Sequence, residues 1–237
     1  MHLRKSKKSI IYFFLLIIFG SINNINLRNI EINKIKSINV DGFENKENRI
    51  ITEKIADLKL DNIFFLDSEK IKKILETNPL IEKYNVFKNY PSSLKIYIVK
   101  TKFLAKINID GNTLIIGSNG KLSDNYLGSD ELPFIFGKPN VDEFLEFKKI
   151  FDKSKFEYDQ IKNLYFFPSK RWDLEFKNSK ILKLPKKFSA GTLDQIFEFI
   201  NDKNFEKIKI IDARINNQII LNEWRFKYRN LFMYFEE

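Results

Sequence analysis

Hydrophobic and polar residues alternate with two periods between residues 32 and 103, and these periods predict the order strand, helix, helix, strand, strand. The residues with strand spacing are Ile38, Val40, Tyr84, Val86, Leu94, Ile96 and Ile98. The residues with helical spacing are Ile51, Ile55, Leu58, Ile71, Ile74 and Leu75. A period of two puts apolar side chains on one face of a strand, and a spacing of three or four puts them on one side of a helix. We therefore expect a three-stranded sheet with both helices on one face.

Between residues 104 and 222, more segments have the two-residue hydrophobic period of a strand than the three- or four-residue spacing of a helix. Two capping patterns, Asn140 with Glu143 and Thr192 with Gln195, each precede a run of helically spaced apolar residues. The apolar residues of these two predicted helices are Phe144, Phe147, Phe151, Leu193, Ile196, Phe197 and Ile200. Strand patterns lie at residues 111–124, 161–176, 178–185 and 207–221. This half is expected to be a larger, mostly antiparallel sheet that carries two helices.

The last strand pattern, "KIKIIDARINNQIIL" at residues 207–221, reads as a hairpin around Asn216-Asn217. Its apolar residues do not alternate cleanly, so both faces of the ribbon carry hydrocarbon. Two interpretations are open. The ribbon is either a core hairpin or a sheet edge kept apolar for a docking partner. The apolar tail that follows, residues 223–237, is expected to be a short helix or strand that covers this sheet, or a second partner contact.

The N-terminus begins with a cluster of cations, Arg4, Lys5, Lys7 and Lys8, and then carries no charge from Ile10 to Ile22. A cleaved signal peptide and a retained membrane anchor both fit this pattern. Thirteen residues span only about 20 Å as a helix, and continuing to residue 27 brings the length to about 28 Å. We favour an uncleaved anchor over residues 9–27, with residues 1–8 in the cytoplasm and the rest of the chain across the membrane.

Composition disfavours several classes of function. The chain has no cysteine and one histidine, His2, so Ser-His-Asp and Cys-His catalysis are excluded. Its net charge of +10 comes from lysines scattered along the chain, which argues against a nucleic-acid interface. The run around Trp172 and residues 165–167 allows a carbohydrate-binding surface, but strand spacing favours core packing. We expect no enzyme activity, no cofactor and no metal site.

Several short stretches then match a known pattern. They are "GF" at residues 42–43, "NIFFLD" at 62–67, "NPLIEKYNVFKNYPSSLKIYIV" at 78–99 and Ala105. Together they resemble a POTRA domain. "LPFIFG" at 132–137 resembles the Leu-Pro-x-x-x-Gly signature of the FtsQ/DivIB family of bacterial cell-division proteins. Two positions depart from the family pattern, Lys100 where an acidic residue is common and Phe103 where a proline is usual.

The resemblance implies an α+β chain in the order of that family. It would have a transmembrane helix at residues 9–27, a POTRA domain (β-α-α-β-β) at 32–103, a mostly antiparallel β domain with two or more helices at 104–222, and a tail at 223–237. It implies a non-enzymatic inner-membrane protein at the division septum. Its partners would be FtsB- and FtsL-type proteins in the periplasm, with FtsK and FtsW/FtsI-type components as further candidates, and its role would be to help recruit and regulate septal peptidoglycan synthesis.

In that family the last strand of the β domain receives an FtsB segment by β-augmentation. Matched by position, Arg214 falls on a basic residue that meets an acidic side chain of FtsB, and Arg171 is a second candidate cation. Ile215, Ile219, Ile220 and Leu221 fall on the hairpin and edge strand, where ordinary core packing is the competing interpretation. The alternative function is a POTRA-containing protein of outer-membrane export or assembly.

Overall fold

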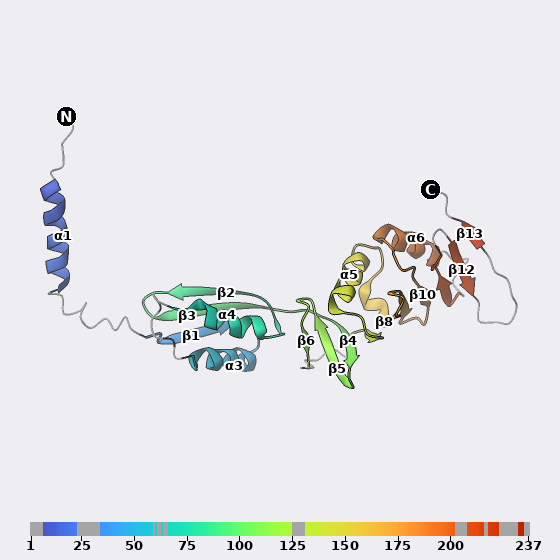
Figure 1. Cartoon of the computed structure of the whole chain (residues 1–237), viewed down its shortest axis with the longest axis horizontal. Coiled ribbons are helices and arrows are strands. Elements are labelled where there is room, and N and C mark those ends of the chain that lie inside the picture. Colours follow the sequence, from blue (N-terminus) through green and yellow to red (C-terminus); the bar gives the residue numbers. More distant parts are fainter. Residues whose placement is uncertain are drawn as a thin grey trace, which may run out of the picture. The chain divides into compact units, whose positions relative to one another are not determined.

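The computed structural model describes residues 7–22, 34–58, 60, 63, 66–124, 131–201, 208–215, 218–222 and 232–234 (Figure 1). The chain divides into two compact units. The first contains residues 1–77 and 84–99, and the second contains residues 78–83 and 100–237. The predicted domain boundary between residues 103 and 104 falls near the start of the longer segment of the second unit.

The first unit has the predicted order of elements. They are β1 (Ser37–Asp41), α3 (Asn45–Ala56), α4 (Ser68–Thr77), β2 (Ile81–Asn89) and β3 (Ser93–Lys100). The strand order is β1-β3-β2, and β1 runs parallel to β3 with Val40 opposite Ile96. The predicted three-stranded sheet and its two helices are therefore confirmed.

The helices pack through the stripes that the sequence predicts. The buried apolar residues described in this unit are Val40, Ile51, Ile55, Ile63, Leu66, Ile71, Leu75, Leu94, Ile96 and Ile98. Asp67 caps α4, because its Oδ1 accepts a hydrogen bond of 3.1 Å from the backbone N of Glu69. Gly42 has φ +131°, and a Cβ at this position would lie 2.0 Å from the backbone O of Ile98. The turn after β1 therefore requires glycine.

The second unit is built on one sheet with the strand order β13-β12-β11-β10-β9-β8-β7-β4-β5-β6. Its strands are β4 (Phe103–Ile109), β5 (Asn112–Gly117), β6 (Leu122–Ser123), β7 (Phe134–Phe136), β8 (Ile161–Phe166), β9 (Trp172–Phe176), β10 (Ile181–Lys183), β11 (Ile210–Asp212), β12 (Gln218–Asn222) and β13 (Phe232–Tyr234). Its helices are α5 (Val141–Phe151), the short 3₁₀ helix η1 (Tyr158–Gln160) and α6 (Ala190–Ile200). The pairs β4–β7, β7–β8 and β10–β11 are parallel and the other neighbouring pairs of this sheet are antiparallel, which confirms a mostly antiparallel sheet.

One row of side chains crosses this sheet and forms its core. Its members are registered opposite one another from strand to strand, and they are Ile107, Ile135, Leu164, Leu174, Leu182 and Ile211. All six are buried in one cluster with Phe144 and Phe147 of α5 and Ile196 of α6. The two helices therefore pack on the face of the sheet that carries this row. Trp172 is 5% exposed and stacks on Phe147 with ring centroids 4.8 Å apart, so core packing, not a carbohydrate platform, describes it.

Two sequence predictions in this unit need correction. Strand β4, which lies between β7 and β5, was not among the predicted elements. Helix α6 is capped by Ser189 rather than Thr192, because Ser189 has extended backbone angles and its Oγ accepts a 3.2 Å hydrogen bond from Thr192 N. The Thr192–Gln195 pattern is therefore inside the helix. The Asn140–Glu143 cap of α5 is confirmed by a 3.0 Å bond from Asn140 N to Glu143 Oε2.

The N-terminal segment contains helix α1 (Lys7–Ile22), whose large apolar side chains from Ile10 to Phe19 are exposed. The predicted transmembrane helix extends to residue 27, and residues 23–27 lie outside the described part of the chain. Within the described residues, no helix combines the length and the apolar character needed to cross a membrane.

Candidate functional site

The strand predicted to be an edge, β12, has a neighbour on each side. It pairs antiparallel with β11, with Asp212 opposite Ile220 and Ile211 opposite Leu221, which confirms the predicted hairpin. On its other side it pairs antiparallel with β13, with Ile219 opposite Met233. Of the alternatives for the tail, residues 232–234 thus form a strand that covers β12 (Figure 1).

The mixed faces of the hairpin follow from its position near the end of the sheet. Ile219 is 1% exposed and belongs to the core, and Leu221 is half-buried against the same core. Ile220 points to the opposite face, because successive side chains of a strand alternate, and it is half-buried there beside Asp212. Ile215, next to the turn, is 53% exposed. Of the four predicted apolar contacts, Ile215 and Ile220 are thus accessible to a partner while the sheet stays intact.

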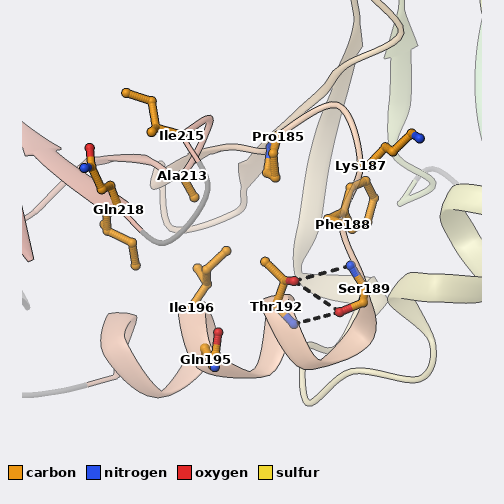
Figure 2. A pocket seen from close by; sticks show the side chains of 11 residues that line it. Pro185, Lys187, Phe188, Ser189, Thr192, Gln195, Ile196, Ala213, Ile215 and Gln218 are labelled. Carbon is orange, nitrogen blue, oxygen red and sulfur yellow. Dashed lines mark hydrogen bonds between the residues drawn. The ribbon is translucent and has the colours of Figure 1, made fainter. Parts of the chain in front are cut away.

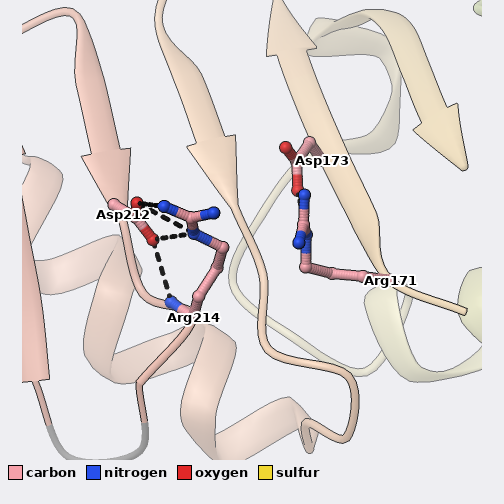
Figure 3. Close-up of polar contacts among 4 residues, drawn as sticks. All are labelled: Arg171, Asp173, Asp212 and Arg214. Atoms are coloured by element: carbon pink, nitrogen blue, oxygen red, sulfur yellow. Dashed lines mark hydrogen bonds and ion pairs between the residues drawn. The ribbon is translucent and has the colours of Figure 1, made fainter. Parts of the chain in front are cut away.

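Arg214 follows β11 and forms a fork with Asp212 (Figure 3). Its Nε donates to Asp212 Oδ1 at 2.7 Å and to Oδ2 at 2.9 Å, and its backbone N donates to Oδ1 at 3.2 Å. Burial opposes ionisation of Asp212, but the hydrogen bonds from Arg214 outweigh it and lower the pKa of this carboxyl. The hydrogen bonds to Asp212 in turn raise the pKa of Arg214. The Arg214 side chain remains 45% exposed.

Arg171 precedes β9 and forms a second pair (Figure 3). Its Nε donates to Asp173 Oδ1 at 3.1 Å, and its guanidinium carbon lies 4.4 Å from the ring centre of Phe167. The Asp173 side chain is only 7% exposed. Burial raises the pKa of Asp173, and the hydrogen bond from Arg171 offsets this only in part.

The sheet brings the two arginines to the same face. Lys183 of β10 stands opposite Asp173 of β9 on one side and Asp212 of β11 on the other. Residues opposite one another in a sheet point to the same face, and this face is turned away from α5 and α6. We call Arg171, Asp173, Lys183, Asp212 and Arg214 the charged row. Ile220 continues it on β12.

A pocket of about 430 Å³ lies beside the hairpin (Figure 2). The hairpin residues Ala213, Ile215 and Gln218 line one side, and Thr192 and Ile196 of α6 line the other (Figure 2). Pro185, Lys187, Phe188, Ser189, Gln195 and Ile219 complete the lining. Its volume is in the range that holds a small ligand or a few side chains of a partner.

Sequence patterns alone did not indicate a site at the pocket residues outside the hairpin. The only local signal was the cap of α6, which was placed three residues too late and therefore left Ser189 out. Within the described ranges, no group of three or more His, Cys, Asp or Glu side chains is placed to hold a metal ion. What the site offers is accessible apolar surface, two paired arginines and the backbone of the end strands.

Comparisons with known proteins point to one family. A family profile described as "POTRA domain, FtsQ-type" matches residues 33–100. The chain is 24% identical over 168 residues to "Cell division protein FtsQ" of Bradyrhizobium diazoefficiens, covering 68% of this chain and 48% of that protein. It is 26% identical over 143 residues to "Cell division protein DivIB" of Bacillus subtilis, covering 59% of this chain and 54% of that protein. The chain thus spans about half the length of the curated relatives it matches.

Proposed function

Because the chain belongs to the FtsQ/DivIB family of cell-division proteins, we propose that it is a non-enzymatic protein of the division site. In this proposal residues 9–27 anchor it in the inner membrane, residues 1–8 are cytoplasmic and both compact units are periplasmic. It binds FtsB- and FtsL-type proteins and so helps to recruit and regulate the synthesis of septal peptidoglycan. FtsK and FtsW/FtsI-type components are further candidate partners.

The observation that supports this proposal is the FtsQ-type POTRA unit followed by a sheet whose last strands carry the exposed Ile215 and the part-exposed Arg214. An FtsB-type segment in extended conformation would lie along these strands. Its acidic side chain would meet Arg214, whose guanidinium is part-exposed even though Asp212 holds it. Its apolar side chains would cover Ile220 and Ile215, and the pocket beside Ile215 would take an anchoring side chain.

The export alternative predicts that the N-terminal segment is cleaved, and the division proposal predicts that it is retained as an anchor. Sequencing the N-terminus of the mature protein tests this, and cleavage between residues 20 and 25 would favour export or assembly. A reporter fused to the C-terminus is expected to be active only outside the cytoplasm. Activity confined to the cytoplasm would exclude the division proposal.

Binding is tested with the full-length chain in detergent micelles and the periplasmic part of the FtsB-type protein of the same organism. Ile220→Lys puts a charge on the docking face and is expected to weaken binding about tenfold or more, while the circular dichroism spectrum stays unchanged. Ile219→Lys is the matched variant one residue away. It buries a charge in the core and is expected to unfold the sheet.

Wild-type binding by a folded Ile220→Lys variant would contradict docking on this face. Absence of any binding by the wild-type chain would contradict the proposed partner.

A further inference from the structure

Strand β13 occupies the outer side of β12, where a visiting strand would have to pair. It contributes three residues, Phe232–Tyr234, against the five of β12. The register sets Gln218 opposite Tyr234, Ile219 opposite Met233 and Ile220 opposite Phe232. The hydrogen bonds of the neighbouring strands determine which residue of β13 forms backbone hydrogen bonds with β12.

The direction of each peptide group follows from the alternation along a strand. Ala213 N donates to Lys183 O at 2.9 Å, so the peptide groups of Ile211 and Ala213 point toward β10. The backbone N–H and C=O of Asp212 therefore point toward β12. Asp212 and Ile220 form a hydrogen-bonded pair. In β12 the peptide groups of Ile219 and Leu221 then point the other way, toward β13.

It follows that Ile219 and Met233 are the hydrogen-bonded pair between β12 and β13. The peptide groups of Phe232 and Tyr234 point away from β12, toward the outer edge of the sheet. A strand that replaced β13 along the whole of β12 would pair with both Ile219 and Leu221. A strand added outside β13 could form hydrogen bonds only with the peptide groups of Phe232 and Tyr234.

We propose that β13 is a displaceable stand-in for the partner strand, and this inference rests on the function proposed above. In the free protein β13 covers the peptide groups of β12, which otherwise would offer a template for pairing between copies of the chain. The partner segment displaces it because a longer strand forms more ladder bonds with β12. Because β13 belongs to the same chain, its high effective concentration lowers the apparent affinity for the partner.

The experiment compares two proline variants of the full-length chain, Met233→Pro and Tyr234→Pro, in binding to the FtsB-type periplasmic fragment. Proline removes a backbone N–H. At Met233 that N–H points to β12, and at Tyr234 it points outward. Loss of the bonds between β13 and β12 is expected to tighten partner binding roughly tenfold in Met233→Pro. Tyr234→Pro is expected to change the affinity less than about threefold, because its lost donor does not face β12.

Amide hydrogen exchange, measured without the partner, tests the pairing of β12 with β13 directly. The amide of Ile219 is expected to exchange faster in Met233→Pro than in the wild type, and to be little changed in Tyr234→Pro. Equal affinity of all three proteins would overturn the inference alone. Weaker binding by Tyr234→Pro would overturn it in favour of a strand added outside β13. Failure of all three to bind would overturn the proposed function, and the inference with it.

Discussion

Two arginine–aspartate pairs stand at the two ends of the charged row, and they differ in how exposed the arginine is and in the direction in which the pKa of the aspartate is shifted. In the pair of β9, Asp173 is almost fully enclosed, Arg171 reaches it through one Nε contact of 3.1 Å, and the pKa of Asp173 is raised. In the pair of β11, Arg214 holds Asp212 through several bonds, and the pKa of Asp212 is lowered. The same residue types at the same spacing, Arg-x-Asp and Asp-x-Arg, thus go with opposite shifts of the aspartate pKa.

The difference in exposure distinguishes Arg171, which has a structural role, from Arg214, which a partner can reach. Arg171 is 23% exposed and lies against Phe167, so its main task is to neutralise a carboxylate that water hardly reaches. Arg214 is 45% exposed and can bind a second carboxylate without leaving Asp212. We therefore expect mutations at the two arginines to affect different properties of the protein.

The largest effect is expected on stability, from Arg171→Met. Methionine keeps an apolar stem over Phe167 but leaves the carboxylate of Asp173 buried without its cation. We expect the free energy of unfolding of the second unit to fall by about 2 kcal/mol. Urea unfolding followed by tryptophan fluorescence measures it, because Trp172 is buried in the core of this unit. Adding Asp173→Asn to this variant is expected to restore part of the loss, and an unchanged unfolding midpoint in the single variant would contradict the structural role.

A smaller effect on stability, but a clear one on binding, is expected from Arg214→Met. Because the lost pair is part-exposed, the free energy of unfolding is expected to fall by no more than about 1 kcal/mol. The affinity for the FtsB-type fragment is expected to fall about tenfold, since an acidic side chain of the partner loses its cation.

The matched control for Arg214→Met is Arg49→Met. Arg49 also pairs with an acid, Glu53, but lies in the first unit and its side chain is 75% exposed. Its loss should leave binding unchanged. Equal losses of affinity in both variants would show that only the net charge matters.

The smallest effect is a difference in pH dependence between Asp173→Asn and Asp212→Asn. The lowered pKa of Asp212 stabilises the wild type above the unfolded value of about 3.9, and this contribution is lost as the pH falls through the folded pKa. The raised pKa of Asp173 has the opposite sign. There the wild type loses stability as the pH rises from about 3.9 through the folded pKa.

Unfolding experiments at about pH 3 and about pH 6 measure this difference. Relative to its asparagine variant, the wild type should gain stability with rising pH at position 212 and lose it at position 173. Changes of the same sign at both positions would contradict the difference between the two pairs.

Local patterns predicted most of the elements. The stripes of α3 and α4, the Asn140 cap and the hairpin of β11 and β12 all depend on residues within a few positions of one another. The cap of α6 was misplaced because Thr192 and Gln195 match a capping pattern although they lie inside the helix. The extended backbone of Ser189 marks where the helix begins.

The candidate site was predicted less completely. The sequence and the family resemblance pointed to Arg171, Arg214 and the hairpin, but not to Lys183 or to the pocket beside α6. These residues come from strands and loops far apart in the chain, and no short-range pattern links them. Ile219 and Ile220 have the same side chain and adjacent positions, and only their places in the sheet separate a core residue from an accessible one.

The amino-acid sequence by itself determined the alternation within most strands, and in the first unit the order of the elements and the family pattern. Only the tertiary structure decided which strand lies beside which, because strand pairing depends on register between distant segments and not on the pattern inside either one. That is why β13 on β12, and the charged row across β9, β10 and β11, emerge only in the folded sheet.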